Sequence, residues 1–416
     1  MGKVDRVILF KNAVETLGYF SEQIAQTLRQ EGVEVFFVDC DQICESLASL
    51  PRFAKCGRTA LITFNFIGIS GEEVFLQENG AYVWELYEPG YLNLLVDHPL
   101  YYHKKIKMLS PGIRERMKLF CLDREHVAYV KRFYPDMEVH FLPTAGNVEI
   151  GMGRNGDFTV FLQSYRRRSY DLIFTANYVP FREMYQKIEA FETDYRIFYQ
   201  EMLDDLILAP GQSLHRVMER HLLQELCVVS EEEMAGAFSN MVMIDLCIRA
   251  YFREKVLAEL ADSGVTVHLF GADWEKFRDN RGLCRHPENL IVNGRQISSA
   301  ECVRAMRNAK LSLNVMPWFK DGAHDRVFTA MLQGCVSLTD DSRYLRAEFE
   351  DGKDLVFYSL EHIKRLPGLV FGLLEDEERA AEIAGRGYRK ACVSHTWKQR
   401  TEKLMGYLIG FGCQKP

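Results

Sequence analysis

RVILF at residues 6–10 is followed by apolar side chains at helical spacing over residues 13–29 and by VEVFFV at residues 33–38. Short runs rich in β-branched and aromatic residues are typical of strands, and apolar residues three and four apart are typical of one helix face. Gly32 stands just before the second run, where a helix commonly ends. Strand, helix and strand in this order predict a right-handed βαβ unit and therefore an α/β fold with a parallel sheet.

The same alternation continues along the first third of the chain. Further strand-like runs, each bounded by polar or glycine-rich turns, occur at residues 59–65, 91–96, 118–122 and 139–142. We therefore expect residues 1–160 to form one Rossmann-like domain. After Pro143 the periodicity is lost and glycines accumulate, which is typical of a linker.

A second array of strand-like runs follows the linker. It lies at residues 170–176, 265–270, 290–292, 311–315, 336–339 and 355–358. The stretch at about 181–262 is helical by spacing and reads as an insertion. We expect residues 161–395 to form a second Rossmann-like domain, and residues 396–416 to form a last helix.

Composition narrows the class of function. The 416 residues are 47% hydrophobic and 26% charged, which suits two folded domains. A formal net charge of −7 gives no field for nucleic acid. The 11 cysteines are scattered, and no signal peptide or apolar run of about 20 residues is visible. These features predict a cytoplasmic protein with reduced thiols, no integral membrane segment and no nucleic-acid partner.

The segment with the clearest chemical signal is residues 311–334. A strand ends there, residues 317–322 form a loop, and AHDR opens a helix that runs to Gly334. The start of a helix presents free backbone N–H groups and a positive dipole end to an anion. Gly322 lets the backbone come close to such a ligand, and Arg326 supplies a charged partner. The pattern predicts a diphosphate site.

A family resemblance rests on this segment. Residues 314–340 (NVMPWFKDGAHDRVFTAMLQGCVSLTD) and 349–358 (FEDGKDLVFY) resemble the C-terminal domain of CgeB-like glycosyltransferases, which have the GT-B fold. The resemblance extends to HLFGADW at 268–274 and to LVDHP at 95–99, and it covers most of the chain. It implies a GT-B architecture of two Rossmann-like domains facing a cleft, with the helical insertion in the C-terminal half. It also implies that the helix at residues 396–416 crosses back to the N-terminal domain.

The resemblance also implies a reaction. A nucleoside-diphosphate sugar, with a UDP-sugar favoured, would donate its sugar to a glycan, a protein or another cell-surface precursor without a metal ion or a cofactor. The implied catalytic residues are Asp97, His98 and Asp321. The implied donor-binding residues are Gly271, Trp274, Asn293, Arg295, Gly322, His324, Asp325, Arg326 and Thr329.

One departure and several alternatives stay open. Many GT-B enzymes carry two glutamates eight positions apart, of which the second binds the ribose, whereas this chain has Asp321 and Thr329. Asp97 and His98 could merely shape a turn, and His324 and Asp325 could merely begin a helix. Gly271 with Trp274 reads almost as well as a turn beside a core tryptophan. An epimerase of the same fold, or an inactive protein that binds nucleotide sugars, would carry the same segments.

Overall fold

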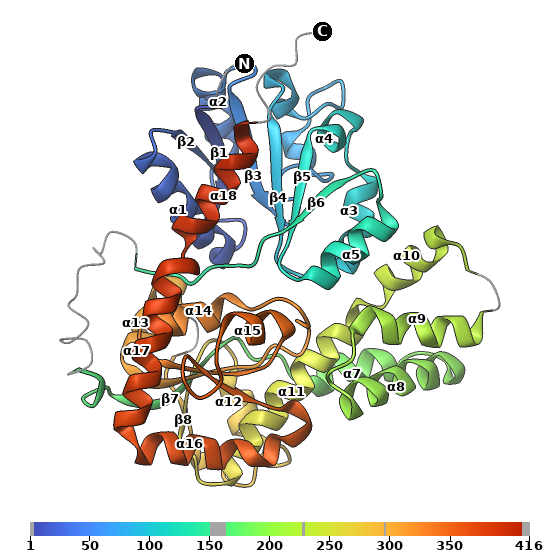
Figure 1. Ribbon diagram of the computed structural model, residues 1–416. Coiled ribbons are helices and arrows are strands. Elements are labelled where there is room, and N and C mark those ends of the chain that lie inside the picture. The colour runs from blue at the N-terminus through green and yellow to red at the C-terminus, as the bar shows by residue number, and fades with distance from the viewer. Residues whose placement is uncertain (1–3, 150–163, 227–228, 295–296, 410–416) are drawn as a thin grey trace. The chain divides into compact units, whose positions relative to one another are not determined.

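The computed structural model describes residues 4–149, 164–226, 229–294 and 297–409 (Figure 1). The chain divides into two compact units. Unit 1 consists of Met1–Ala145 together with His395–Pro416, and unit 2 of Gly146–Ser394. Arg295 and the glycine-rich stretch 150–163 lie outside the described residues. Within the described part, no helix is both long and apolar enough to cross a membrane.

Unit 1 is built on a six-stranded parallel sheet with the order β2-β1-β3-β4-β5-β6. Its strands are β1 Arg6–Lys11, β2 Glu34–Asp39, β3 Thr59–Phe64, β4 Gly90–Leu95, β5 Met117–Cys121 and β6 Glu138–Phe141. Its helices are α1 Glu15–Gln30, α2 Ile43–Phe53, α3 His103–Lys107, α4 Pro111–Glu115, α5 Arg124–Phe133 and α18 Trp397–Leu408. The predicted opening βαβ unit is therefore present as β1, α1 and β2.

Side chains alternate between the two faces of this sheet, as the period of two in a strand requires. Ile8 and Phe10 of β1 belong to one buried cluster, and Val7 and Leu9 belong to another. The second cluster also contains Trp397, from the helix α18 that packs along α1 (Figure 1). The last helix therefore completes the core of the unit in which the chain begins.

Unit 2 contains a second parallel six-stranded sheet with the order β12-β11-β10-β7-β8-β9. Its strands are β7 Tyr170–Thr175, β8 Val267–Phe270, β9 Leu290–Val292, β10 Ala309–Asn314, β11 Val336–Asp340 and β12 Val356–Tyr358. The helices that follow β8 are α12 Trp274–Arg278, α13 Ser299–Arg307, α14 Asp325–Leu332, α15 Arg343–Glu348, α16 Leu366–Glu375 and α17 Glu377–Ser394.

The predicted helical insertion joins β7 to β8. It consists of α7 Phe181–Glu189, α8 Thr193–Leu208, α9 Leu214–Glu225, α10 Glu231–Asn240 and α11 Val242–Asp262. Helices α8 and α9 lie side by side at a distance from the strands, and the long α11 leads the chain back to the sheet (Figure 1). The expectation of a helix-rich insertion in this half is confirmed.

The strand order of unit 2 reverses between β7 and β10. These two strands are neighbours with Phe174 opposite Leu313, although β8 and β9 lie between them in the sequence. At such a reversal the chain leaves the two strand ends in opposite directions, so their carboxyl ends are left open to a ligand. Thr175 and Asn314 end the two strands at this point.

Candidate functional site

The loop that follows β10 is held by two side chains at and just after the end of β11. The backbone N–H of Met316 donates to Asp340 Oδ1 over 2.7 Å, and Ser342 Oγ donates to the carbonyl of Gly322 over 2.6 Å. Burial raises the pKa of Asp340 to about 7. Gly322 is itself buried. These two hydrogen bonds fix the loop, and therefore also the position of His324 at the start of α14.

His324 is the N-cap residue of α14, and its ring contacts both residues that follow it. Its Nδ1 lies 2.7 Å from Asp325 Oδ1, and its Nε2 lies 2.9 Å from Arg326 Nη2. Nη1 of Arg326 donates to the carbonyl of Thr175 over 2.8 Å. Because Thr175 ends β7, the guanidinium is held at the strand reversal. The structure thus brings together three of the residues that the sequence analysis selected.

Burial and charge set the protonation of this group. Burial, aided by the charge of Arg326, lowers the pKa of His324 to about 4, so its imidazole is neutral at pH 7. Burial would raise the pKa of Asp325, but the contact with His324 and the charge of Arg326 outweigh it and leave that pKa lowered. A neutral imidazole with its proton on Nδ1 donates to the carboxylate and accepts from the guanidinium.

Two arginines of the insertion lie at the same place. Arg249 and Arg253 of α11 have their guanidinium carbons 4.2 and 5.6 Å from the ring centre of Trp318. The ring centres of His324 and Trp318 are 5.9 Å apart, and the two rings form a T-shaped pair. Neither arginine was predicted from the sequence. Their spacing of four on one helix face was a usable signal, but only the fold shows which loop they meet.

The cluster of Arg249, Arg253, Arg326, Asp245 and Asp325 carries an excess of positive charge. Three guanidinium groups stand against two carboxylates, of which Asp245 lies 2.6 Å from Arg249. Burial and the neighbouring charges of Arg326 and Arg249 lower the pKa of Arg253 to about 9. Its Nε is buried without a hydrogen-bond partner in the described part of the chain. Buried polar atoms rarely lack a hydrogen-bond partner. An anion would supply an acceptor for the Nε–H group of Arg253.

The hydroxyl of Thr329 makes two hydrogen bonds within the protein. Its hydroxyl donates to the carbonyl of Asp325 over 2.9 Å and accepts from the backbone N–H of Asn147 over 2.9 Å. The residue is only 2% exposed. The hydroxyl therefore both donates and accepts a hydrogen bond within unit 2, and the donor-binding role of Thr329 stays a prediction.

The remaining donor-side residues occupy strand ends. Gly271 has φ +138°, and the Trp274 indole donates to the carbonyl of Ala176 over 2.6 Å from a fully buried position. The amide of Asn293 donates to the carbonyl of Ile291 over 2.8 Å. Asp321 Oδ2 lies 3.4 Å from Arg343 Nε. Trp274 thus has the core position that was weighed as its alternative. Its donor-binding role stays a prediction, as do those of Gly271 and Asn293 and the catalytic role of Asp321.

Asp97 and His98 follow β4 in unit 1. Asp97 Oδ2 accepts from the Tyr102 hydroxyl over 3.2 Å and is half-buried. His98 is 2% exposed, and its Nδ1 accepts from the backbone N–H of Leu100 over 3.1 Å. It is therefore His98 rather than Asp97 that caps the following turn, and Asp97 is the more accessible of the two.

In residues 4–149, 164–226, 229–294 and 297–409, no three His, Cys, Asp or Glu side chains gather so that they could hold a metal ion. The positive groups that the structure does describe near the strand reversal are the arginines and the start of α14.

Residues 249–406 match the model of a family described as glycosyl transferase-like. This match begins at the first arginine of the cluster and contains the whole segment that carried the resemblance, which it confirms. No protein of curated function matches the chain in sequence.

Several solved structures share the fold over nearly the whole chain. The sucrose-phosphate synthase of Thermosynechococcus elongatus is 11% identical, with a TM-score of 0.52 and coverage of 97% of this chain and 98% of that one. HepE of Anabaena, solved with UDP-glucose, is 8% identical, with a TM-score of 0.53 and coverage of 97% and 99%. An alpha-glucosyltransferase in complex with UDP-glucose and DNA containing an abasic site is 10% identical, with a TM-score of 0.53 and coverage of 97% and 99%. These likenesses confirm the expected two-sheet α/β architecture.

Proposed function

We propose that this chain, a glycosyltransferase of the GT-B fold, binds a nucleoside-diphosphate sugar at the carboxyl ends of β7 and β10 and transfers its sugar to a hydroxyl group of a glycan or protein. The observation that carries the proposal is the excess positive charge around Arg253 and Arg326, with the unsatisfied Nε of Arg253 buried in it. A diphosphate carries the charge and the acceptor oxygens that this cluster lacks.

The cluster supports a way of lowering the barrier. When the bond from the anomeric carbon to the diphosphate breaks, negative charge grows on the leaving oxygen. Fixed guanidinium groups in a partly dehydrated site stabilise that charge without reorganising. Because Arg253, Arg326 and the positive end of α14 supply this stabilisation, we propose a reaction that is independent of a metal ion.

UDP is the favoured nucleotide. HepE and the alpha-glucosyltransferase were both solved with UDP-glucose and share the fold of this chain. In the proposal, Gly271 and Asn293 line the nucleoside side, and Asp321 lies near the sugar. His324 holds Arg326 in place as an uncharged hydrogen-bond partner.

The acceptor hydroxyl must lose its proton as the new bond forms, which calls for a general base. We propose Asp97 for this role, since it is half-buried at the end of β4, whereas the Nδ1 of His98 is engaged by the backbone of Leu100. The net change is a new bond from the acceptor oxygen to the anomeric carbon, with the proton on the carboxylate and the nucleoside diphosphate as leaving group.

A panel of UDP-, GDP-, dTDP- and CMP-sugars tests the proposal by the rise in melting temperature that a ligand of the native state produces. A UDP-sugar is expected to give the largest rise. Incubation of that donor with candidate acceptors should then release free UDP. A sugar that changes configuration while it stays on the nucleotide would identify an epimerase instead, and a panel without any shift would overturn the proposal.

A further inference from the structure

The segment that follows unit 1 directly is seated on helix α14. A Cβ added to Gly146 would lie 2.6 Å from the carbonyl carbon of Phe328, so the two backbones touch here. Asn147 is 4% exposed. Its backbone N–H donates to Thr329 Oγ1 over 2.9 Å, and its carbonyl accepts from Gln333 Nε2 over 3.2 Å. Residue 147 is therefore fixed through its backbone on both sides.

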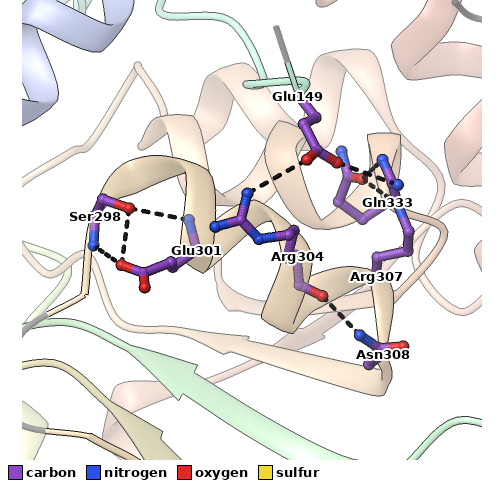
Figure 2. Close-up of polar contacts among 7 residues, drawn as sticks. All are labelled: Glu149, Ser298, Glu301, Arg304, Arg307, Asn308 and Gln333. Carbon is purple, nitrogen blue, oxygen red and sulfur yellow. Dashed lines mark hydrogen bonds and ion pairs between the residues drawn. The ribbon is translucent and has the colours of Figure 1, made fainter. Parts of the chain in front are cut away.

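Two residues further on, the segment is also tied to α13 (Figure 2). The carboxylate of Glu149 lies 3.3 Å from Arg304 Nη1 through one oxygen and 3.3 Å from Arg307 Nη1 through the other. Arg307 in turn reaches the side chain of Gln333, which holds the carbonyl of Asn147. These contacts limit how far the side chain of Asn147 can shift along α14.

The side chain of Asn147 points to Asp325, at the start of α14 in the proposed donor site. Asn147 Nδ2 donates to Asp325 Oδ2 over 3.1 Å, while the other oxygen of Asp325 lies 2.7 Å from His324 Nδ1. With one oxygen engaged by the amide and the other by the imidazole, the carboxylate has a single orientation. The chain of contacts then continues from His324 Nε2 to Arg326 Nη2 over 2.9 Å.

The orientation of Asp325 decides the tautomer of His324. A carboxylate oxygen only accepts, so Nδ1 carries the proton and Nε2 is left to accept from the guanidinium. Nδ1 also lies 3.2 Å from the backbone nitrogen and 3.3 Å from Nε of Arg326, two N–H groups that compete to donate to it. The contact with Asp325 Oδ1 is shorter, at 2.7 Å, and places the proton on Nδ1. If Asp325 turned away, Nδ1 would accept from that backbone N–H instead. The proton would then be on Nε2 and would face Nη2 of Arg326, so the 2.9 Å hydrogen bond between these two atoms would be lost.

We propose that Asn147 is a positioning residue: through Asp325 it sets the tautomer of His324 and thereby holds the guanidinium of Arg326 for an anionic ligand. Only the identity of that anion as a diphosphate rests on the function proposed above. The positioning itself is a property of the unliganded chain.

Asn147→Ala and Asn147→Ser test this with two readouts. The ¹⁵N shifts of the His324 ring report the tautomer, and titration calorimetry with UDP reports affinity. The native chain is expected to show His324 with its proton on Nδ1. Both variants should show a mixture of tautomers and bind UDP about tenfold more weakly, because a hydrogen bond to a charged group is lost. Asn147→Ser keeps the backbone contacts and a small polar side chain, so it is measured even if the alanine variant folds poorly.

The matched control is Asn308→Ala, which removes an exposed amide that caps the carbonyl of Arg304 at the end of α13. It should change neither readout. The proposal is overturned if an Asn147 variant keeps the native tautomer, or if it keeps UDP affinity within twofold of the native chain. If the native chain itself does not bind UDP, the donor assignment fails, and the ring shifts still decide the role of Asn147.

Discussion

Arg253 is a charged side chain in surroundings that disfavour its charge. Burial and two neighbouring guanidinium groups lower its pKa to about 9, so in the absence of an anion it costs stability. We expect Arg253→Met to leave the free energy of unfolding unchanged or to raise it, while UDP affinity falls at least tenfold, about 1.4 kcal/mol. Urea unfolding and titration calorimetry measure the two quantities.

A purely structural arginine would behave in the opposite way, with lower stability and unchanged UDP affinity. The matched control for the substitution is Lys255→Met, on the same helix, where an exposed ammonium stands 5.5 Å from the ring of Tyr251. It should leave UDP affinity unaltered. Equal losses of affinity in both variants would show a general effect of net charge and would count against a specific site.

His103 is a buried histidine that lies between two tyrosine hydroxyls. Its Nδ1 is 2.6 Å from Tyr134 Oη and its Nε2 is 2.6 Å from Tyr129 Oη. Burial, aided by the charge of Lys107, lowers its pKa from 6.5 to about 4. Between these values the unfolded chain binds a proton that the folded chain does not, so stability is lost as the pH falls through this window.

Lowering the pH from 7.5 to 5.0 should therefore destabilise the native chain by about 2 kcal/mol through His103. We expect His103→Gln to show a pH dependence that is smaller by this amount in urea unfolding at the two pH values. His286→Gln, at an exposed histidine of unit 2, should retain the full dependence. An identical pH dependence in the native chain and in His103→Gln would show that this histidine is not held neutral.

At the scale of single residues, part of the candidate site could be predicted from the sequence. His324 and Arg326 were found because a strand, a glycine loop and a helix start are visible in the chain itself. Arg249 and Arg253 were missed because their importance depends on contact with Trp318, which is 69 and 65 positions away in the sequence. Asn147 lies in a stretch without periodicity, where no pattern indicates which side chain is buried.

Among the elements, the turn after β8 depends on one glycine. Gly271 has φ +138°, and an added Cβ would lie 2.0 Å from the carbonyl oxygen of Ala176, at the end of the neighbouring strand. Both the backbone angle and the contact exclude a side chain. We expect Gly271→Ala to lower the free energy of unfolding of unit 2 by about 3 kcal/mol, as measured by urea unfolding.

The control is Gly236→Ala in α10, where an added Cβ meets no atom within 4 Å. Because alanine is the better helix former, this variant should be slightly more stable, by up to about 1 kcal/mol. If Gly271→Ala were as stable as Gly236→Ala, the close approach of β8 and β7 at this turn would be wrong.

The elements were the part of the fold that the sequence indicated best. Runs such as RVILF at 6–10 and YDLIFTA at 170–176 coincide with β1 and β7 because β-branched and aromatic side chains suit a buried sheet. The insertion was recognised from helical spacing alone. The packing within the insertion could not be predicted, because α8 and α11 have weakly amphipathic sequences. Their neighbours decide which faces of these helices are buried.

For the whole molecule, tandem strand arrays predicted two Rossmann-like sheets, and the strand orders confirm them. The order itself could not be read from the sequence, since every strand run looks alike and only tertiary packing places β10 beside β7. The contribution of the last helix to unit 1 was expected from the resemblance rather than from any residue. Its physical basis is the buried cluster that Trp397, Leu404 and Leu408 share with β1 and α1.

Unit 1 therefore depends on a side chain that follows all of unit 2 in the sequence. The ring of Trp397 is 2% exposed and lies 4.9 Å from that of Phe20 and 6.4 Å from that of Phe64, centre to centre. Removing such a ring should destabilise unit 1 by about 3–5 kcal/mol. In scanning calorimetry we expect Trp397→Ala to lower the melting temperature of one transition and Gly271→Ala that of another. Lys398→Ala, at the next and half-exposed position, should lower neither. If both destabilising variants shifted one shared transition, the two units would unfold together, and the prediction that each sheet folds around its own core would be wrong.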